Sequence, residues 1–467
     1  MREESDFFYN EDETMEVVQR FETMLKHNKN YFFDVVDFEN IIDFYLSSDN
    51  SKLASEAVDI AYSMHPYSTE IQLRKAELLV IDKKYDEAIS ILAVLERIEP
   101  DNGEIFILKG QAYLEQKELK KANEAFWQVT NCFTEDKVDM LYRIASLYQE
   151  AEEANYAIRF LLLANSIEGN SLNILFDLGY CYERIGDLEK SDKYYNLYLD
   201  INPFSSSVWY NLGIIHTRSG SFAKALNAYD FALVVDPKNV SAIHNMANTY
   251  ATIEKYAEAV ELFISLINLE PDNPRVYSSI GECYEKLEEH DKAIDYFDRA
   301  LGILSSLSDA YYGKALVYLK TERVNLAHEN IKMALALEPE NYDFWLGLGK
   351  IKFEMGKDDE AIDAYKEATQ LNADEPDAFI GLAEIRLFQE RFEEVEEIYH
   401  EVGEKFTDVP ALKIIYAAAL YLQGKPKLSI NMLKQAKVHN PFTVEDFLAI
   451  VSVVSDDDFS LKLKQLK

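Results

Sequence analysis

The sequence repeats itself every 34 residues, and this period limits the fold more than any other feature. Seven dipeptides that end in proline mark the period, and they lie 34 residues or a multiple of 34 apart, with one residue inserted. They are His65-Pro66, Glu99-Pro100, Asn202-Pro203, Asp236-Pro237, Glu270-Pro271, Glu338-Pro339 and Asn440-Pro441. Such a period is the signature of small units that stack on one another, so the chain is predicted to form a solenoid rather than several globular domains.

Counting each repeat from 31 residues before its proline gives twelve repeats. They begin at Val35, Thr69, Gly103, Val138, Leu172, Ser206, Val240, Pro274, Ser308, Tyr342, Pro376 and Pro410. The eighth position is alanine or glycine in every repeat but the first, which has Ile42, and the twentieth position is usually alanine. Two columns of small residues let two antiparallel helices approach closely, while aromatic residues at positions eleven and twenty-four fill the space around them. Each repeat is therefore predicted to be a helix pair, and the chain to be all-α.

The residues at these fixed positions resemble the tetratricopeptide repeat family. One repeat, for instance, contains Trp209, Leu212, Gly213, Ala225, Tyr229, Ala232 and Pro237. The resemblance covers nearly the whole chain and implies a right-handed superhelical solenoid of about twelve helix-turn-helix repeats over residues 35–443. Residues 1–34 are expected to form an acidic N-terminal segment with a capping helix over Asp12 to Lys26, and residues 444–467 to form C-terminal capping helices. Such caps are expected because an end repeat must cover its apolar face.

Glycine and proline mark the expected ends of the two helices in each repeat. Gly186, Gly220, Gly356 and Gly424 stand at the fifteenth position, where glycine tolerates the left-handed conformation that closes a helix. Proline at position thirty-two lacks an N–H donor and disfavours helix in the residue before it. The first helix is therefore predicted to end near position fifteen and the second near position thirty-two.

The chain carries 47 Lys and Arg against 83 Asp and Glu, which gives a formal net charge of −36. This excess repels the phosphates of nucleic acids and of anionic membrane surfaces, so no nucleic-acid partner is expected. Two interpretations of the acidity remain open. It belongs either to a solvated surface that keeps the chain soluble or to a binding surface for a basic partner.

The cysteine pattern and the lack of long apolar segments indicate in which cellular compartment the protein is expected. Cys132, Cys181 and Cys283 lie far apart and are odd in number, which fits free thiols better than a disulfide framework or a zinc knuckle. The N-terminus has no apolar stretch typical of a secretory signal, and no segment reaches the ~20 apolar residues of a membrane helix. The protein is therefore expected in the cytoplasm, without membrane insertion.

Motifs for catalysis are missing from the sequence. The segment Gly347-Leu348-Gly349-Lys350 lacks the full spacing of a phosphate-binding loop and falls in a predicted helix, whose interior has no exposed N–H groups. His328-Glu329 and His400-Glu401 lack the second histidine that a helical zinc site needs. No GxSxG segment occurs either. The chain is expected to be no enzyme and to bind no cofactor or metal.

The resemblance implies where a partner binds. In this family the first helix of each repeat lines a concave groove, and positions 2, 5, 6, 9, 12 and 13 point into it. The family's carboxylate clamp for chaperone tails is incomplete here: Asn245 and Arg275 match it, but Tyr210, Ile214 and Ser279 replace its other residues. Asn211 and Asn245, at position 6 of consecutive repeats, resemble instead the asparagine ladder that holds peptide backbones in the family's sugar-transferase branch.

A basic and aromatic strip surrounds these asparagines in five consecutive repeats from Leu172 to Asn341. Its cations stand at position 13 and its other members at positions 5 and 9: Arg184, Arg218, Lys286 and Lys320, with Tyr210, His244, Asn248 and Tyr312. The strip is a candidate site for an acidic, extended segment, held by charge-assisted hydrogen bonds and aromatic contact. The alternative is that the cations only complement the helix dipole in the last turn.

The predicted function is a non-catalytic scaffold or adaptor that binds another protein or an extended peptide in the concave groove. Two alternatives remain: a co-chaperone or assembly factor, and the regulatory subunit of an enzyme complex whose catalytic chain is separate. The sequence carries no marker of oligomeric state.

Overall fold

A computed structural model describes residues 3–27, 31–48, 50–402, 405–406, 409–437, 447 and 450–451. Side chains are described throughout these ranges except for residues 3–13, Ser51 and Lys437. The C-terminal capping helices predicted over 444–467 therefore lie outside the described residues, apart from Phe447, Ile450 and Val451.

The described residues form 25 α-helices and no strand. After α1 (Glu3–His27), they make twelve successive pairs: α2 (Val35–Ser47) with α3 (Ser51–Met64), α4 (Thr69–Ile81) with α5 (Tyr85–Ile98), α6 (Gly103–Glu115) with α7 (Leu119–Gln128), α8 (Lys137–Glu150) with α9 (Ala154–Ile167), α10 (Leu172–Arg184) with α11 (Leu188–Ile201), α12 (Ser206–Arg218) with α13 (Phe222–Val235), α14 (Val240–Thr252) with α15 (Tyr256–Leu269), α16 (Pro274–Lys286) with α17 (His290–Ile303), α18 (Ser308–Lys320) with α19 (Val324–Leu337), α20 (Tyr342–Glu354) with α21 (Asp358–Leu371), α22 (Asp377–Phe388) with α23 (Phe392–Val402), and α24 (Pro410–Leu422) with α25 (Pro426–Lys437).

These pairs confirm the predicted all-α repeat fold. The first helix of a pair begins at the predicted residue in ten repeats, and α8 and α22 begin one residue away from it. The third repeat, which carries the extra residue, has a shorter second helix, and the 3₁₀ turn Val129–Asn131 follows it. That turn accommodates the insertion without changing the next repeat.

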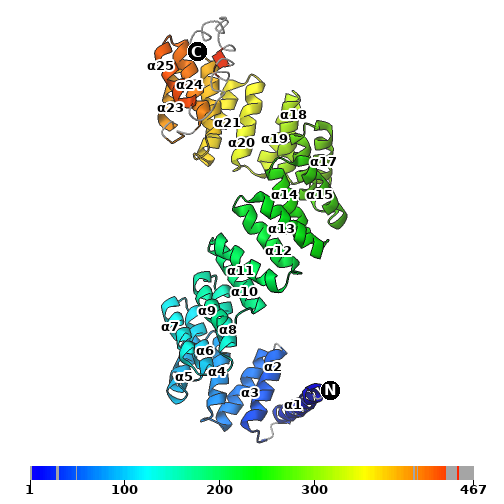
Figure 1. Ribbon diagram of the computed structural model, residues 1–467, viewed down its shortest axis with the longest axis vertical. Coiled ribbons are helices and arrows are strands. Elements are labelled where there is room, and N and C mark those ends of the chain that lie inside the picture. The colour runs from blue at the N-terminus through cyan, green and yellow to red at the C-terminus, as the bar shows by residue number, and fades with distance from the viewer. Residues whose placement is uncertain are drawn as a thin grey trace. The chain divides into compact units, whose positions relative to one another are not determined.

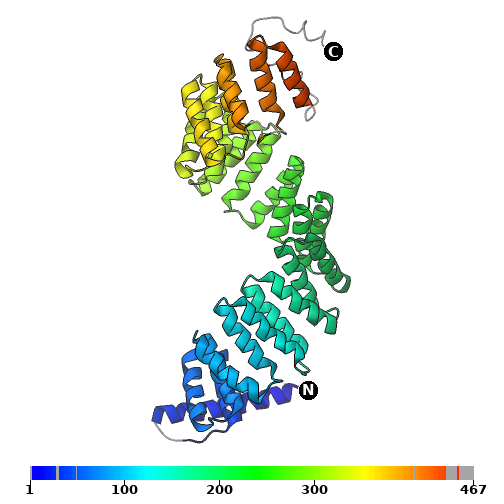
Figure 2. The same ribbon diagram turned by 90° about the vertical axis from the view of Figure 1, so that its left-hand side faces the viewer.

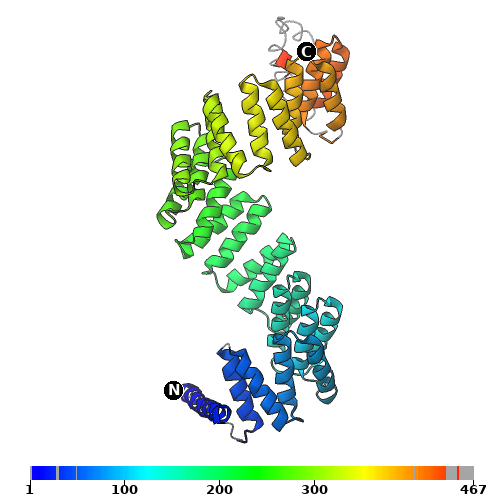
Figure 3. The same cartoon turned by 180° about the vertical axis from the view of Figure 1, so that it is seen from behind.

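The chain divides into two compact bodies, Met1–Val235 and Asp236–Lys467, which we call the N-terminal and C-terminal bodies. Within each body, the two helices of a pair lie side by side, and the second helix contacts the first helix of the next pair (Figure 1). Figures 2 and 3 show the same pairing from the side and from behind. Contacts between near neighbours in the sequence therefore build each body, as expected for a repeat protein.

The N-terminal cap differs from the prediction in length. The helix predicted over Asp12–Lys26 extends over Glu3–His27. Val18, Phe21 and Met24 are buried in one cluster with side chains of α2, whereas Met15 of the same helix is 45% exposed.

The close approach of the two helices in a repeat depends on position eight. A Cβ atom added to Gly213 would lie 2.2 Å from Cε1 of Tyr229, which stands at position twenty-four of the same repeat and is 1% exposed. Four other repeats pair glycine with an aromatic ring in the same way: Gly110 with Phe126, Gly179 with Tyr195, Gly281 with Phe297, and Gly349 with Tyr365. The glycine thus makes room for the ring.

The turn between the two helices has one backbone conformation in eleven repeats. Gly186, Gly220, Gly356 and Gly424 have φ between 68° and 81°, as predicted. The fifteenth position of seven other repeats has the same left-handed conformation with a charged residue: Lys83, Lys117, Glu152, Glu254, Glu288, Glu322 and Glu390. Glycine therefore marks only some of these turns, because a charged side chain at an exposed turn tolerates the ~1 kcal/mol cost of this conformation.

Candidate binding surface on the inner helices

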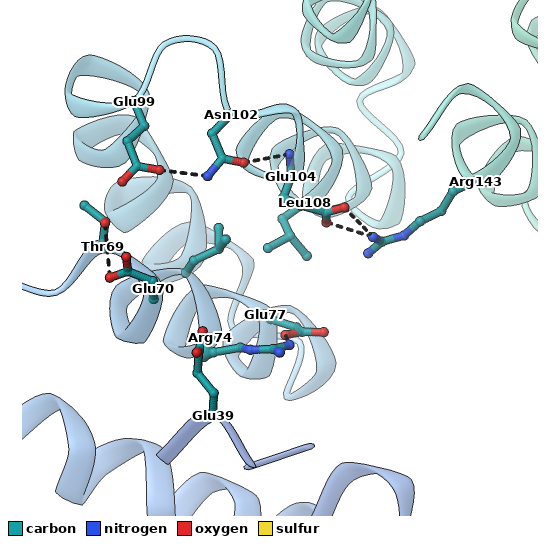
Figure 4. Close-up of a pocket in the computed structure, with 11 residues that line it drawn as sticks. Glu39, Thr69, Glu70, Arg74, Glu77, Glu99, Asn102, Glu104, Leu108 and Arg143 are labelled. Carbon is teal, nitrogen blue, oxygen red and sulfur yellow. Dashed lines mark hydrogen bonds and ion pairs between the residues drawn. The ribbon is translucent and has the colours of Figure 1, made fainter. Parts of the chain in front are cut away.

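We call the first helix of each pair the inner helix and the second the outer helix. A cavity of about 380 Å³ opens among the inner helices of the first four repeats in the N-terminal body (Figure 4). Glu39 of α2, Leu73, Arg74 and Glu77 of α4, Leu108 of α6 and Arg143 of α8 line it. They stand at positions 5, 6 and 9 of their repeats, which the sequence predicted to face the groove. The volume falls in the range of ~300–1,000 Å³ that is usual for ligand sites.

Both arginines of this cavity form ion pairs within the protein. Arg74 Nη2 lies 2.8 Å from Asp43 Oδ1, and Arg74 Nη1 lies 3.0 Å from Glu77 Oε2. Arg143 Nη1 lies 2.7 and 3.0 Å from the two carboxylate oxygens of Glu104 (Figure 4). The guanidinium groups therefore connect neighbouring repeats.

Three carboxylates of the cavity lack such a cation. Glu70 accepts a hydrogen bond from Ser68 Oγ at 2.7 Å, which lowers its pKa, and Glu99 accepts one from Asn102 Nδ2 at 2.8 Å. Burial raises the pKa of Glu39, together with the negative charges of nearby Glu70 and Asp43, although Arg74 opposes the shift. Within the described ranges, no lysine or arginine lies at ion-pair distance from these three carboxylates.

The asparagines proposed from the sequence divide between the two bodies. Asn211, on α12 of the N-terminal body, donates from Nδ2 to the hydroxyl of buried Tyr195 at 3.2 Å. Asn245 and Asn248 lie on α14 of the C-terminal body, where exposed Asn248 lies 3.1 Å from His244 Nδ1, one turn away. Asn211 thus has a contact inside its own body, and the peptide-binding ladder stays a prediction.

The four cations of the predicted strip all lie at ion-pair distance from carboxylates. In the N-terminal body, Arg184 lies 3.7 Å from Glu152 and Arg218 lies 3.2 Å from Glu183. In the C-terminal body, Lys320 and Lys286 both contact Glu285, and the Lys286 Nζ to Glu285 Oε2 distance is 3.1 Å. The acidic ligand expected for the strip would have to compete with these internal pairs, and its binding stays a prediction.

Glu285 is a residue that the sequence analysis missed. Its side chain is 5% exposed, and although burial opposes the shift, Lys320 and Lys286 lower its pKa. The sequence did contain a signal for this residue, namely glutamate at position 12 followed by a cation at position 13, as in Glu183-Arg184 and Glu285-Lys286. The partner across the repeat boundary, however, lies about one repeat further along the chain.

The aromatic members of the strip take part in packing. Tyr210 lies 6.2 Å from Tyr229 between ring centroids, and the His244 and Phe263 rings are 6.0 Å apart. Tyr312 packs 5.0 Å from Phe344 of the next repeat, and burial raises its pKa to about 12. Arg275 is exposed on α16, and its positive charge counters the rise that burial and Glu338 cause in the pKa of Asp309.

Comparison with known proteins identifies the repeat. Models described as "Tetratricopeptide repeat" match residues 172–205, 242–277 and 274–306, and one described as "TPR repeat" matches 349–387. Segments 172–205 and 274–306 each cover one helix pair, α10 with α11 and α16 with α17. The chain is a tetratricopeptide repeat protein. Repeats of this kind indicate a protein–protein interaction scaffold, and the family is typically non-catalytic.

Several solved structures resemble this tetratricopeptide repeat protein, whereas no curated protein matches it. The APC/C hetero-tetramer Cut9-Hcn1 is 16% identical, with 89% of each chain covered and a TM-score of 0.43. A tetratricopeptide repeat protein from Parabacteroides merdae is 18% identical over 61% of this chain and 99% of its own, with a TM-score of 0.44. YrrB, described as a TPR protein with an unusual peptide-binding site, is 19% identical over 39% of this chain and 95% of its own, with a TM-score of 0.32.

The described residues offer neither a metal site nor a membrane-spanning helix. Among the described residues, no group of three His, Cys, Asp or Glu side chains is placed to hold a metal ion. No helix in the same ranges is both long and apolar enough to cross a membrane. All three cysteines are free and buried, and burial raises the pKa of each thiol.

Proposed function

We propose that this tetratricopeptide repeat protein is a non-catalytic scaffold or adaptor that holds an extended segment of another protein against its inner helices. One observation carries the proposal: a cavity of ligand-site volume lies on the inner helices of four consecutive repeats, and six of its lining residues stand at positions 5, 6 and 9. Side chains at one set of positions in successive repeats form a continuous row. Such a row suits an extended chain, which meets one repeat after another.

The residues proposed from the sequence form a second candidate region on the same kind of surface. Asn245, Asn248 and His244 lie on α14, and Asn248 is exposed. An amide both donates and accepts hydrogen bonds, so it can satisfy one peptide unit of an extended ligand. We keep this region as a separate proposal, to be tested beside the cavity.

A capture experiment on native extract tests both regions. Leu73→Trp puts a bulky ring into the cavity, and the triple variant Asn211→Ala, Asn245→Ala, Asn248→Ala removes the proposed ladder. Leu162→Trp, on the outer helix α9 where Leu162 is 37% exposed, is the matched control. Circular dichroism checks that every variant retains its helices.

We expect Leu73→Trp to lose a partner that the control retains. Loss in the asparagine variant instead would place the binding region in the middle repeats. If both inner variants keep every partner of the wild type, the inner helices are not the binding surface and the proposal fails.

A cytoplasmic location is part of the same proposal. Free thiols at Cys132, Cys181 and Cys283 fit a reducing compartment. Fractionation with an antibody against the native protein tests it, because recovery in a secreted or membrane fraction would contradict it.

A further inference from the structure

We propose that the cavity of the first four repeats takes a basic segment, an extended peptide that presents lysine or arginine side chains. This inference rests on the proposed binding of a protein segment by the inner helices and names its chemical class. The ligand proposed here is basic, whereas the strip in the middle repeats was predicted to bind an acidic one.

The first argument is the balance of charge around the cavity. Five glutamates line it, namely Glu39, Glu70, Glu77, Glu99 and Glu104, against two arginines. The arginines are paired with Asp43, Glu77 and Glu104 within the protein. An acidic ligand would therefore have to displace an internal carboxylate, whereas a basic ligand has carboxylates to contact.

The second argument concerns the carboxylates that remain. Glu39, Glu70 and Glu99 have no lysine or arginine at ion-pair distance in the part of the chain that the structure describes. Glu39 is half-buried, and its pKa rises chiefly because burial destabilises the ionised form; Arg74 opposes the rise, while Glu70 and Asp43 add to it. A ligand cation would stabilise the ionised form of Glu39 and donate charge-assisted hydrogen bonds to the carboxylates.

The third argument is the apolar part of the lining. Leu73 and Leu108 contribute to the wall between the charged groups. Lysine and arginine have long apolar stems that pack on such surface while the charged head reaches a carboxylate. The cavity therefore offers complementary contacts to both parts of these side chains.

The lining of a second cavity, to which α6 also contributes, likewise has more carboxylates than cations. It measures about 500 Å³, and α6, α8 and the turns after them line it. Glu115, Glu150 and Glu153 contribute three carboxylates, against the single cation of Lys117. Because α6 contributes to both cavities, a segment with two or more basic residues could place one in each.

Peptide binding by the full-length protein tests the inference. The probe is an array of random ten-residue peptides, and the readout is the Lys and Arg content of those retained at physiological salt. The groove variant is Glu39→Gln, Glu70→Gln, Glu99→Gln. The matched control, Glu87→Gln, Glu124→Gln, Glu189→Gln, removes the same charge from exposed sites on the outer helices α5, α7 and α11.

We expect the wild type and the outer-helix control to retain peptides enriched in Lys and Arg, and the groove variant to lose the enrichment. For the best peptide, fluorescence anisotropy should give about a tenfold weaker affinity for the groove variant, from three contacts of ~0.5 kcal/mol each, and little change for the control. If both variants lose affinity for basic peptides equally, the net charge of the protein alone accounts for the binding. That result, or enrichment in Asp and Glu, overturns the inference.

Because residues Leu461 to Lys467 are themselves basic, the array is repeated with Lys462→Gln, Lys464→Gln, Lys467→Gln. Basic peptides that bind only this variant support the basic class and identify this segment as a competitor. Absence of binding in both backgrounds overturns the inference. The capture experiment tests the proposed function separately: it fails if both Leu73→Trp and the asparagine variant keep every partner. A partner that Leu73→Trp loses but the groove variant keeps contradicts only the basic class of the ligand.

Discussion

Gly213→Ala tests whether the Tyr229 ring requires glycine at position eight of its repeat, although two other repeats combine alanine with a ring at these positions, Ala247 with Phe263 and Ala383 with Tyr399. The added Cβ would lie 2.2, 2.4 and 2.7 Å from three carbons of the Tyr229 ring, which is buried and whose hydroxyl lies 3.2 Å from Thr217 Oγ1. Overpacking of this kind costs ~1–3 kcal/mol, whereas alanine gains up to ~1 kcal/mol over glycine within a helix. We expect a net loss of about 1–2 kcal/mol.

Hydrogen exchange measured by mass spectrometry suits this prediction, because long repeat arrays depart from two-state unfolding. Peptides that cover α12 and α13 should exchange ~5–30 times faster in Gly213→Ala than in the wild type, since each 1.4 kcal/mol corresponds to a factor of ten. The matched control is Gly302→Ala in α17, where an added Cβ meets no atom within 4 Å. That variant should exchange more slowly than the wild type.

A compensating change separates the steric cause from others. Gly213→Ala with Tyr229→Leu recreates the combination that the fourth repeat uses, Ala145 with Leu161, both fully buried. The double variant should recover most of the stability that Gly213→Ala loses. If Gly213→Ala exchanges as slowly as the wild type, or if the double variant is no better than the single one, the proposed coupling between positions eight and twenty-four is refuted.

Three further predictions use other parts of the structure. Glu288→Gly, at an exposed turn with φ 60°, should stabilise the C-terminal body by up to ~1 kcal/mol in thermal melts, while the same change at neighbouring Glu289 should not. Glu285→Gln should cost about 1–2 kcal/mol at pH 7. Because the folded-state pKa of Glu285 is lowered, its carboxylate stabilises the fold above the ordinary glutamate pKa, and the difference between the melts should shrink as the pH falls through the folded-state pKa. Burial raises the pKa of Cys181 to about 11 and of Cys283 to about 12, so both should react with a disulfide reagent at pH 8 only as fast as the helices open; rapid labelling of both would contradict their burial.

The repeat boundaries could be predicted because the signals that set them are local. Proline at position thirty-two and small residues at positions eight and twenty act within one helix pair, so the predicted starts differ from the observed ones by at most one residue. The left-handed turns were predicted only at glycine. Lys83 and Glu254 adopt the same conformation because its modest cost leaves no trace in the sequence.

The cavity of the first four repeats could not be predicted from the sequence, and the site predicted around Asn211 stays a prediction. Residues at positions 5, 6 and 9 contribute to the lining of this cavity. Cavity volume depends on how side chains of different repeats fill the inner face, which spacing alone does not specify. The ion pair of Arg218 with Glu183 likewise joins residues 35 apart that only the stacking of helices brings together.

The match between glycine and ring within a repeat also bears on how such a chain can be recombined. Both members of each pair, such as Gly349 and Tyr365, lie inside one 34-residue segment. A crossover or duplication whose breakpoint falls between repeats transfers the two residues together and preserves the fit. A breakpoint between the two helices can join alanine to a ring that lies as close as that of Tyr229 does to Gly213, or glycine to a smaller side chain, leaving a clash or a void. Exchanges of whole repeats should therefore give folded chimaeras more often than exchanges of single helices.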